Sequence, residues 1–453
     1  MLFNWLRTKA MLLDWLQIEA MLLDWLRIEK PNMHVDDDDA FASTTAVAWP
    51  EPSHRRSWPL RLGSRPVTAA LAGVPGSSPT HQPTAGAMTG IVQLLHIKPP
   101  YPPPNCHPAA LRPFRPPKQL PWPTGSLVPA IITFGDSTVD VGNNDYVATI
   151  FKADYPPYGR DFANHKPTGR FCNGKLATDI TAETLGFTTY APAYLSPQAS
   201  GKNLLIGANF ASAGSGYDEK TAALSHAIPL SQQLEYYKEY QGKLAKVAGD
   251  SKAKSILKDA LYIAGFGSSD FVQNYYVNPF INKLYTPDQY SSYLVGIFSN
   301  FVQELYGLGA RKIGATSLPP LGCIPATITL FGFHQNGCVS RLNSDAQRFN
   351  NKLNAAASKL KKQLPGLKLV IFDIYKPLFD LVQSPSKSGF AEARKGCCGT
   401  GTIETTSLLC NPKSIGTCSN ATQYVFWDSV HPSEAANQVL ADALIVQGID
   451  LIS

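Results

Sequence analysis

The sequence predicts an α/β fold: residues 126–453 are expected to form a three-layer α/β/α sandwich with a mainly parallel sheet, preceded by an irregular N-terminal extension. Two observations carry this prediction. Short apolar runs alternate with helical patterns, which is typical of βαβ crossovers and of a parallel sheet covered on both faces. Hydrophobic residues also make up 44% of the chain and charged residues 16%, which is a globular composition with ample core material.

The N-terminal extension, residues 1–125, differs from the rest in composition. Residues 1–30 contain one ten-residue motif three times, as MLFNWLRTKA, MLLDWLQIEA and MLLDWLRIEK. This repeat is compatible with an amphipathic helix for a membrane surface or a partner, or with a duplicated segment that has no evolved role. Residues 99–123 are rich in proline, which opposes helix and central strand alike. We therefore expect residues 1–125 to be a disordered tail or linker.

The apolar runs of the domain define its expected strands. The first run, LVPAIITF, ends at Phe134 and predicts a buried strand because it is short and β-branched. Further strands are expected over residues 203–211, 260–266, 311–317 and 367–375. Apolar residues at three- and four-residue spacing predict helices over residues 230–247, 291–309, 340–364 and 433–445. In such a fold the site is expected at the carboxyl ends of the strands.

Charge and hydropathy exclude several function classes. The formal net charge is +6, and Lys and Arg are scattered along the chain, so nucleic-acid binding has no electrostatic basis. No run of eighteen or more apolar residues occurs, so no transmembrane helix is expected. A clean signal peptide is also missing, because charged residues interrupt the apolar residues of the first thirty positions. We expect a monomer.

The cysteines gather in the last third of the chain. Six of the eight lie there: Cys323, Cys338, Cys397, Cys398, Cys410 and Cys418. They do not form two separated C-x-x-C pairs and no histidine cluster accompanies them, so disulfides are favoured over a zinc site. Free thiols in a cytosolic enzyme are the alternative, and the pairing cannot be read from the sequence. The sequon Asn420-Ala421-Thr422 agrees with a secretory route.

A candidate nucleophile follows the first expected strand. Ser137 stands just past the strand end in the segment FGDST, where Gly135 and Asp136 allow a sharp turn. Doubly wound sheets place reactive groups at this edge. The alternative is a serine that only caps the next helix.

A candidate base and its orienting carboxylate lie near the C-terminus, in the segment FWDSVHPS. A serine hydroxyl needs a base within hydrogen-bond reach, and the base needs a partner that fixes its tautomer. His431 and Asp428 are three residues apart in a tight loop, which suits these two roles, and Ser433 suits the cap of the following helix. The alternative is that His431 only packs at the start of that helix.

These two segments resemble the first and last signature blocks of GDSL-type esterases/lipases of the SGNH hydrolase family. Residues 209–216, NFASAGSG, resemble the second block, and residues 265–271, GFGSSDF, resemble the third, which is usually written G-x-N-D. The segments DVGNND, PYGRDF, PTGRFCNGK, LPPLGCIP and CCGTG are similar to the plant branch of the family. The resemblance covers residues 126–451, and four blocks in order at domain-scale spacing make a specific signal.

The resemblance implies a role for each matching residue. Ser137 is the expected nucleophile, His431 the general base and then the acid, and Asp428 the residue that orients His431. The backbone N–H groups of Ser137 and Gly214 are expected to form the oxyanion hole. Ser269 stands where the family has an oxyanion asparagine. A hydroxyl is shorter and freer to rotate than an amide, so Ser269 replaces the asparagine fully, in part through water, or not at all.

Other residues near these blocks have simpler interpretations. Thr138 replaces the leucine of the family name at a position expected to point away from the chemistry, and Asp270 is expected to accept hydrogen bonds that shape its loop. Three histidines without a patterned partner are interpreted as surface or loop residues: His165, His226 and His334. Three aromatic residues after the third block either line an acyl pocket or pack in the core: Tyr275, Tyr276 and Phe280.

The motifs and the resemblance together predict a serine ester hydrolase that acts on lipid or other acyl esters through an acyl-enzyme intermediate, without a metal or organic cofactor. One alternative is an acyltransferase that passes the acyl group to an alcohol. Another is a non-catalytic lipid- or carbohydrate-binding protein on the same scaffold, which the substitution at Ser269 motivates. Secretion is expected from the resemblance, the cysteines and the sequon, with residues 1–125 as an unusual or mis-assigned extension in place of a signal peptide.

Overall fold

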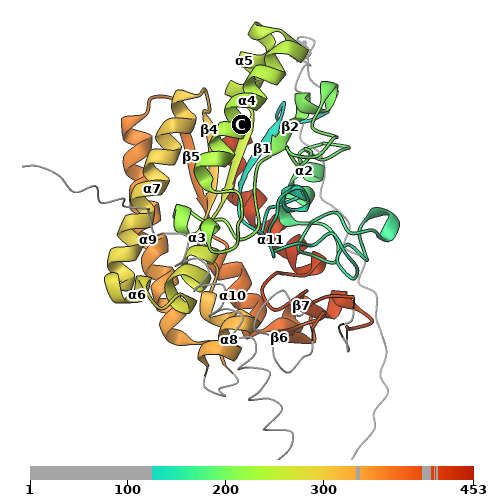
Figure 1. Ribbon diagram of the computed structural model, residues 1–453, viewed down its shortest axis with the longest axis vertical. Coiled ribbons are helices and arrows are strands. Elements are labelled where there is room, and N and C mark those ends of the chain that lie inside the picture. The colour runs from blue at the N-terminus through green and yellow to red at the C-terminus, as the bar shows by residue number, and fades with distance from the viewer. Residues whose placement is uncertain (1–124, 333–336, 400–409, 413, 415–416, 453) are drawn as a thin grey trace, which may run out of the picture. The chain divides into compact units, whose positions relative to one another are not determined.

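The computed structural model describes residues 125–332, 337–399, 410–412, 414 and 417–452 (Figure 1). The expectations for the N-terminal repeat, the Pro-rich segment and His334 lie outside these residues. Within them, helices cover both faces of a parallel sheet, which confirms the predicted fold class.

The central sheet has five parallel strands in the order β2-β1-β3-β4-β5. The strands are β1 (Ile131–Gly135), β2 (Gly207–Asn209), β3 (Leu261–Gly265), β4 (Lys312–Thr316) and β5 (Lys368–Phe372). Gly135 at the end of β1 pairs with Gly265 at the end of β3. The loops that follow these two strands therefore leave the same edge of the sheet side by side.

The expected strand over residues 203–211 is shorter in the structure. Gly201–Ile206 form a 3-10 helix, and only Gly207–Asn209 pair with β1. Gly207 has a φ of 107°, and a Cβ at this position would overlap the carbonyl group of Ile131. The apolar run breaks here because the chain approaches β1 more closely than any residue with a side chain permits.

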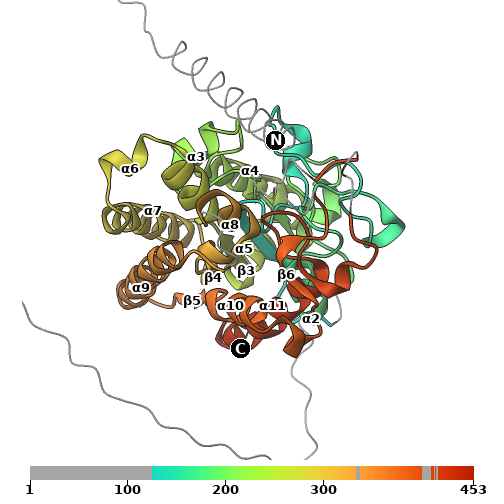
Figure 2. The same ribbon diagram turned by 90° about the horizontal axis from the view of Figure 1, so that it is seen from below.

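Two layers of helices pack on the two faces of the sheet (Figures 1 and 2). The first layer contains α4 (Leu230–Ala248), α5 (Asp250–Asp259), α7 (Pro287–Gly307) and α9 (Ser340–Gln363), and the second contains α2 (Ala177–Thr184), α11 (Glu434–Gln447) and α12 (Ile449–Ile452). Successive residues of β1 alternate between the layers, since Ile132 packs in the cluster of the first and Ile131 in that of the second. Both faces are apolar, as expected for a covered parallel sheet.

Local sequence explains where the helices begin. α7 starts with a capping box, in which Thr286 Oγ1 accepts from the N–H of Gln289 and the Gln289 side chain accepts from the N–H of Thr286. α11 starts after Ser433, whose Oγ accepts from the N–H of Ala436 at 3.2 Å. Ser433 is therefore the cap that its sequence position predicted, and it fixes the end of the loop that contains His431.

Smaller elements complete the domain. They are α3 (Glu219–Ala223), α6 (Ile281–Leu284), α8 (Pro325–Phe331), α10 (Tyr375–Gln383) and a π-helix over Asp270–Val277. Outside the central sheet, β6 (Glu392–Gly396) and β7 (Tyr424–Phe426) form a parallel pair. None of the helices among the described residues is both long and apolar enough to cross a membrane.

Candidate active site

Ser137 lies in the turn that follows β1, at the carboxyl edge of the sheet. The end of β1 is held by the buried Gln233 of α4, whose side-chain amide accepts from the N–H of Gly135 and donates to its carbonyl, both at 3.0 Å. The next residue, Asp136, is buried and accepts hydrogen bonds from the N–H and the hydroxyl of Thr138. Ser137 is therefore a partly exposed residue between two anchored neighbours.

His431 and Asp428 lie in the loop between β7 and α11, and the fold places them next to Ser137. The Oγ of Ser137 is 2.6 Å from Nε2 of His431. On the other side of the ring, Nδ1 of His431 is 2.8 Å from Oδ2 and 3.0 Å from Oδ1 of Asp428. A carboxylate only accepts hydrogen bonds, so Nδ1 carries the ring proton and Nε2 accepts from Ser137. The structure thus brings these three candidate residues into one hydrogen-bonded chain.

Several donors surround the buried carboxylate of Asp428. Oδ1 accepts the N–H groups of Val430 at 2.8 Å and His431 at 2.7 Å, and Oδ2 accepts the hydroxyl of Tyr158 at 2.9 Å as well as the His431 ring. Burial opposes the charged form, but the charge of His431 and the hydrogen bonds from its ring and from the two backbone N–H groups lower the pKa of Asp428 below its usual value. Tyr158 belongs to the PYGRDF segment, and nothing in that motif assigned it to this carboxylate.

Two backbone N–H groups near Ser137 are unoccupied by protein acceptors. Within the described part of the chain, neither the N–H of Ser137 nor that of Gly214 donates a hydrogen bond. Gly214 has a φ of 85°, which favours glycine. A Cβ at Gly214 would overlap the Oγ of Ser225 and lie 2.8 Å from the ring of Phe151. The backbone at Gly214 is therefore closely packed, with its N–H left available to a ligand.

The VDVGNND loop after Ser137 holds the Gly214 segment in place. Asn144 Nδ2 donates to the carbonyl of Ala213 at 2.9 Å, and Asp140 Oδ2 accepts from the N–H of Ala213 at 3.0 Å. Asn143 Nδ2 donates to two further carbonyl groups of the same segment, at 2.8 Å and 2.9 Å. The motif is thus a polar scaffold that fixes the backbone before Gly214, a role that its sequence did not reveal.

Ser269 emerges at the same edge of the sheet, four residues after the end of β3. Its side chain is 6% exposed. The Nε2 of Gln273, one turn later in the π-helix, donates to the Oγ of Ser269 at 3.5 Å. Because β3 pairs with β1, the loop that contains Ser269 leaves the sheet next to the loop that contains Ser137.

Asp270 shapes its loop, as expected. Its carboxylate accepts the N–H groups of Tyr217 at 2.8 Å and Asp218 at 3.0 Å and the hydroxyl of Thr221 at 2.6 Å. These bonds tie the start of the π-helix to the segment just after Gly214. The third sequence block, which contains Asp270, is therefore hydrogen-bonded to the residues that directly follow the second block.

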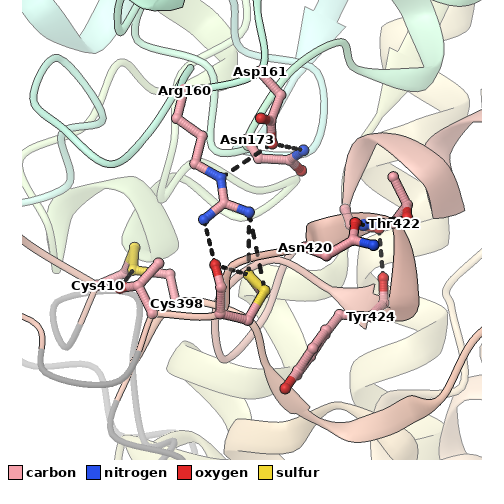
Figure 3. Close-up of a disulfide and its surroundings, with 12 residues drawn as sticks. Arg160, Asp161, Asn173, Cys398, Cys410, Asn420, Thr422 and Tyr424 are labelled. Carbon is pink, nitrogen blue, oxygen red and sulfur yellow. Dashed lines mark hydrogen bonds and ion pairs between the residues drawn. A yellow bond between two sulfur atoms is a disulfide. The ribbon is translucent and has the colours of Figure 1, made fainter.

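The six late cysteines form the pairs Cys323–Cys338, Cys397–Cys418 and Cys398–Cys410, which confirms the preference for disulfides. The last two bridges lie behind the loop of Asp428 and His431, because the N–H of Cys398 donates to the carbonyl of Trp427 at 2.6 Å. Figure 3 shows Arg160 pointing into this bridged region, where it donates to the carbonyl of Cys418 at 2.6 Å. The two bridges are thus hydrogen-bonded to the residues that lead into the loop of Asp428 and His431.

Two histidines and three aromatic residues that the motifs do not assign to the site are described in the structure. His165 and His226 are exposed, as expected of surface residues. Tyr275 and Tyr276 are buried in the main apolar cluster, whereas Phe280 is 46% exposed. Of the two interpretations of these aromatic residues, core packing therefore applies to Tyr275 and Tyr276 but not to Phe280. Among the described residues, no three His, Cys, Asp or Glu side chains are grouped so that they could hold a metal ion.

Comparisons with known proteins find both distant and close similarities. A solved acetylxylan esterase from Geobacillus stearothermophilus aligns over 71% of this chain and 94% of its own, with 13% identity and a TM-score of 0.33. GDSL esterase/lipase APG of Arabidopsis thaliana is 75% identical over 326 residues, covering 72% of this chain and 92% of that protein. A second A. thaliana GDSL esterase/lipase is 61% identical over 330 residues, covering 72% of this chain and 91% of that protein. The family model for GDSL-like Lipase/Acylhydrolase matches residues 131–444. On this match and these identities, the chain belongs to the GDSL-like lipase/acylhydrolase family.

Proposed function

We propose that this ester hydrolase uses Ser137 as its nucleophile and proceeds through an acyl-enzyme intermediate. The observation that carries the proposal is the 2.6 Å contact between Ser137 Oγ and His431 Nε2, with Asp428 hydrogen-bonded to the other nitrogen of the ring. A free serine hydroxyl is a weak nucleophile at neutral pH. This arrangement supplies both the base that activates it and the carboxylate that orients the base.

In the first half of the proposed reaction, Ser137 Oγ attacks the carbonyl carbon of the ester while His431 Nε2 takes the hydroxyl proton. The bond between the carbonyl carbon and the alcohol oxygen then breaks, and His431 gives the proton to the leaving alcohol. In the second half, His431 takes a proton from water as the water oxygen attacks the acyl carbon. The bond between the acyl carbon and Ser137 Oγ then breaks, His431 returns the proton to Ser137 Oγ, and the carboxylic acid is released. Asp428 stabilises the imidazolium without taking its proton.

Negative charge develops on the carbonyl oxygen in both halves, and the N–H groups of Ser137 and Gly214 are the proposed donors to it. Ser269 is the proposed third donor. Gln273 Nε2 donates to the oxygen of Ser269 at 3.5 Å, so the Ser269 hydroxyl keeps its own proton to donate. A hydroxyl must lose rotational freedom before it helps, so we expect Ser269 to contribute less than the asparagine of the family motif.

The proposed substrates are esters of lipids or of other acyl groups, in line with the descriptions of the relatives as esterases/lipases. An acyltransferase would use the same acyl-enzyme and differ only in the alcohol that replaces water, and no contact among the described residues favours it over hydrolysis. A purely binding role gives no reason for Ser137, His431 and Asp428 to be assembled in one chain of hydrogen bonds.

Ester hydrolysis by the full-length protein tests this proposal. The wild type is incubated with p-nitrophenyl acetate and p-nitrophenyl palmitate, with and without an acceptor alcohol, and release of p-nitrophenol is followed. Ser137→Ala should remove nearly all activity, since loss of a catalytic serine costs as much as ~10⁶ in kcat. Ser255→Ala, on the exposed side of α5, is the control and should behave as wild type. A Ser137→Ala protein that keeps more than a few per cent of the activity removes Ser137 from the mechanism.

We also infer that the protein is secreted, with residues 126–453 as its catalytic domain and Asn420 as an N-glycan site. Disulfides persist in oxidising compartments. Asn420 is exposed, and the Thr422 hydroxyl of the same sequon donates to its side-chain carbonyl at 2.7 Å (Figure 3). Glycosidase treatment of native protein followed by peptide mass measurement tests the site. An unmodified Asn420 together with free late cysteines would contradict secretion.

A further inference from the structure

We propose that Tyr158 is a positioning residue that holds Asp428 in the orientation that serves His431. This inference rests on the proposed function, because it requires Asp428 and His431 to act on Ser137. It starts from the 2.9 Å hydrogen bond that the Tyr158 hydroxyl donates to Oδ2 of Asp428. The two residues are 270 positions apart, so the contact exists only in the folded protein.

The two oxygens of Asp428 are held in different ways. Oδ1 accepts the N–H groups of Val430 and His431, which belong to its own loop. Oδ2 accepts from the ring of His431 at 2.8 Å and from Tyr158. Among the contacts of the described residues, Tyr158 is therefore the donor that holds Oδ2 independently of the ring that Asp428 must orient. Without it, the carboxylate gains freedom to rotate about its Cβ–Cγ bond.

Tyr158 keeps its proton and so acts as a donor. Its side chain is 1% exposed, and burial together with the neighbouring Asp428 carboxylate raises the pKa of Tyr158 well above its usual value. A hydrogen bond to the ionised form of an acid favours that form. Tyr158 thus helps to keep Asp428 ionised in a buried position, where it stabilises positive charge on His431.

The direction of the Tyr158 hydroxyl is set by the rings around it. The Tyr158 ring packs at steep angles against Phe171, with 5.7 Å between centroids, and against Trp427, with 6.3 Å. Phe171 in turn lies 5.1 Å from the ring of His431, and Trp427 directly precedes Asp428. The same aromatic residues therefore hold the tyrosine, the histidine and the backbone of the carboxylate, which preorganises all three.

Arg160 ties the Tyr158 segment to the bridged region behind the loop (Figure 3). Its guanidinium lies 5.0 Å from the centroid of the Trp427 ring and donates to the carbonyl of Cys418 at 2.6 Å. Cys418 is bridged to Cys397, whose N–H donates to the last residue of β7 at 3.0 Å. Tyr158 is thus anchored to the same strand that leads into the catalytic loop, so donor and carboxylate keep their relative positions.

The first test is Tyr158→Phe, which removes the hydroxyl and keeps the ring. We expect kcat to fall about 10-fold, the worth of one hydrogen bond to a charged group. KM should stay unchanged, because the buried Tyr158 does not contact substrate. The acidic limb of the kcat/KM profile should move to higher pH, because Asp428 with one hydrogen-bond donor fewer is more easily protonated.

Tyr155→Phe is the matched control. The Tyr155 ring packs on Tyr158 with 5.6 Å between centroids, and no hydrogen bond from the Tyr155 hydroxyl is found among the described residues. It should therefore keep the wild-type kcat and pH profile. A Tyr158→Phe enzyme with a lowered Tm but the pH profile of Tyr155→Phe would show that Tyr158 is merely structural and overturn the inference.

A double-mutant cycle with Asp428→Asn shows whether Tyr158 acts through Asp428. Tyr158→Phe should lower kcat about 10-fold in the wild type and have no further effect on the residual activity of Asp428→Asn. An equal loss in both backgrounds overturns the inference. Ser137→Ala, measured alongside, separates the two proposals. If Ser137→Ala stays active, the proposed function fails; if it is inactive while Tyr158→Phe matches the wild type, only the inference about Tyr158 fails.

Discussion

Gly214→Ala should reduce both stability and turnover, because the backbone that presents the Gly214 N–H suits only glycine. The φ of 85° costs alanine roughly 1–2 kcal/mol. The added Cβ also overlaps the Oγ of Ser225 and lies 2.8 Å from the ring of Phe151. Overpacking of this kind typically costs about 1–3 kcal/mol. The free energy of unfolding should therefore fall by roughly 2–5 kcal/mol in total.

The same strain displaces the N–H that is the proposed oxyanion donor. Removal of one such donor typically lowers the rate ~10²- to 10³-fold. We expect kcat of Gly214→Ala to fall within this range while KM changes little, because the interaction is made mainly in the transition state. Steady-state hydrolysis of p-nitrophenyl acetate measures kcat and KM, and urea denaturation measures the free energy of unfolding.

Gly389→Ala provides the control for backbone strain alone. Gly389 has a φ of 83°, nearly that of Gly214, but a Cβ there meets no atom within 4 Å. It should lose roughly 1–2 kcal/mol of stability and keep the wild-type kcat. A Gly214→Ala enzyme as active as Gly389→Ala would refute the oxyanion assignment. Equal stability of the two variants would refute the steric argument.

Three further predictions concern Ser269, the cysteines and Asp270. Ser269→Ala should lower kcat about 10- to 100-fold with little change in KM, and Ser269→Asn should raise kcat above the wild type. A Ser269→Ala enzyme with lowered Tm and unchanged kcat would mean that only backbone N–H groups donate to the oxyanion. Alkylation in denaturant without reductant, followed by peptide mass spectrometry, should label Cys172 and spare the six bridged cysteines, and labelling of all six would point to a reducing compartment. Burial raises the pKa of Asp270 to about 7, although the hydrogen bonds from Thr221 and two backbone N–H groups act in the opposite direction. Between about pH 4 and pH 7 the folded state therefore holds a proton on Asp270, whereas an unfolded aspartate, with a pKa near 3.9, has released it. The free energy of unfolding should therefore fall as the pH rises from about 4 to about 7, and Asp270→Asn should flatten this slope in urea titrations; the same slope in both proteins would contradict the assignment.

Most of the fold was predictable from local patterns. The strands β3, β4 and β5 lie within the apolar runs that predicted them, because a strand covered on both faces must be apolar along its length. The apolar run over residues 203–211 predicted a strand that is longer than the one observed, because hydrophobicity does not reveal how close two backbones come. At Gly207 that distance decides the conformation, and the run becomes a 3-10 helix before it pairs with β1.

For the candidate site, too, local sequence supplied one part of the description and the tertiary structure supplied the other. The sequence by itself indicated which three residues to propose for the chemistry, because Ser137 follows a strand end and Asp428 stands three residues before His431, a spacing that needs only one tight loop. Only the tertiary structure decided that the Ser137 hydroxyl reaches a ring 294 positions away, that Tyr158 reaches the carboxylate, and which cysteines pair. These contacts depend on how loops that are distant in the sequence pack together at one edge of the sheet. Hydrogen bonds and disulfides form only when the atoms come within a few ångströms, and the sequence between the two partners has no pattern that reveals this distance.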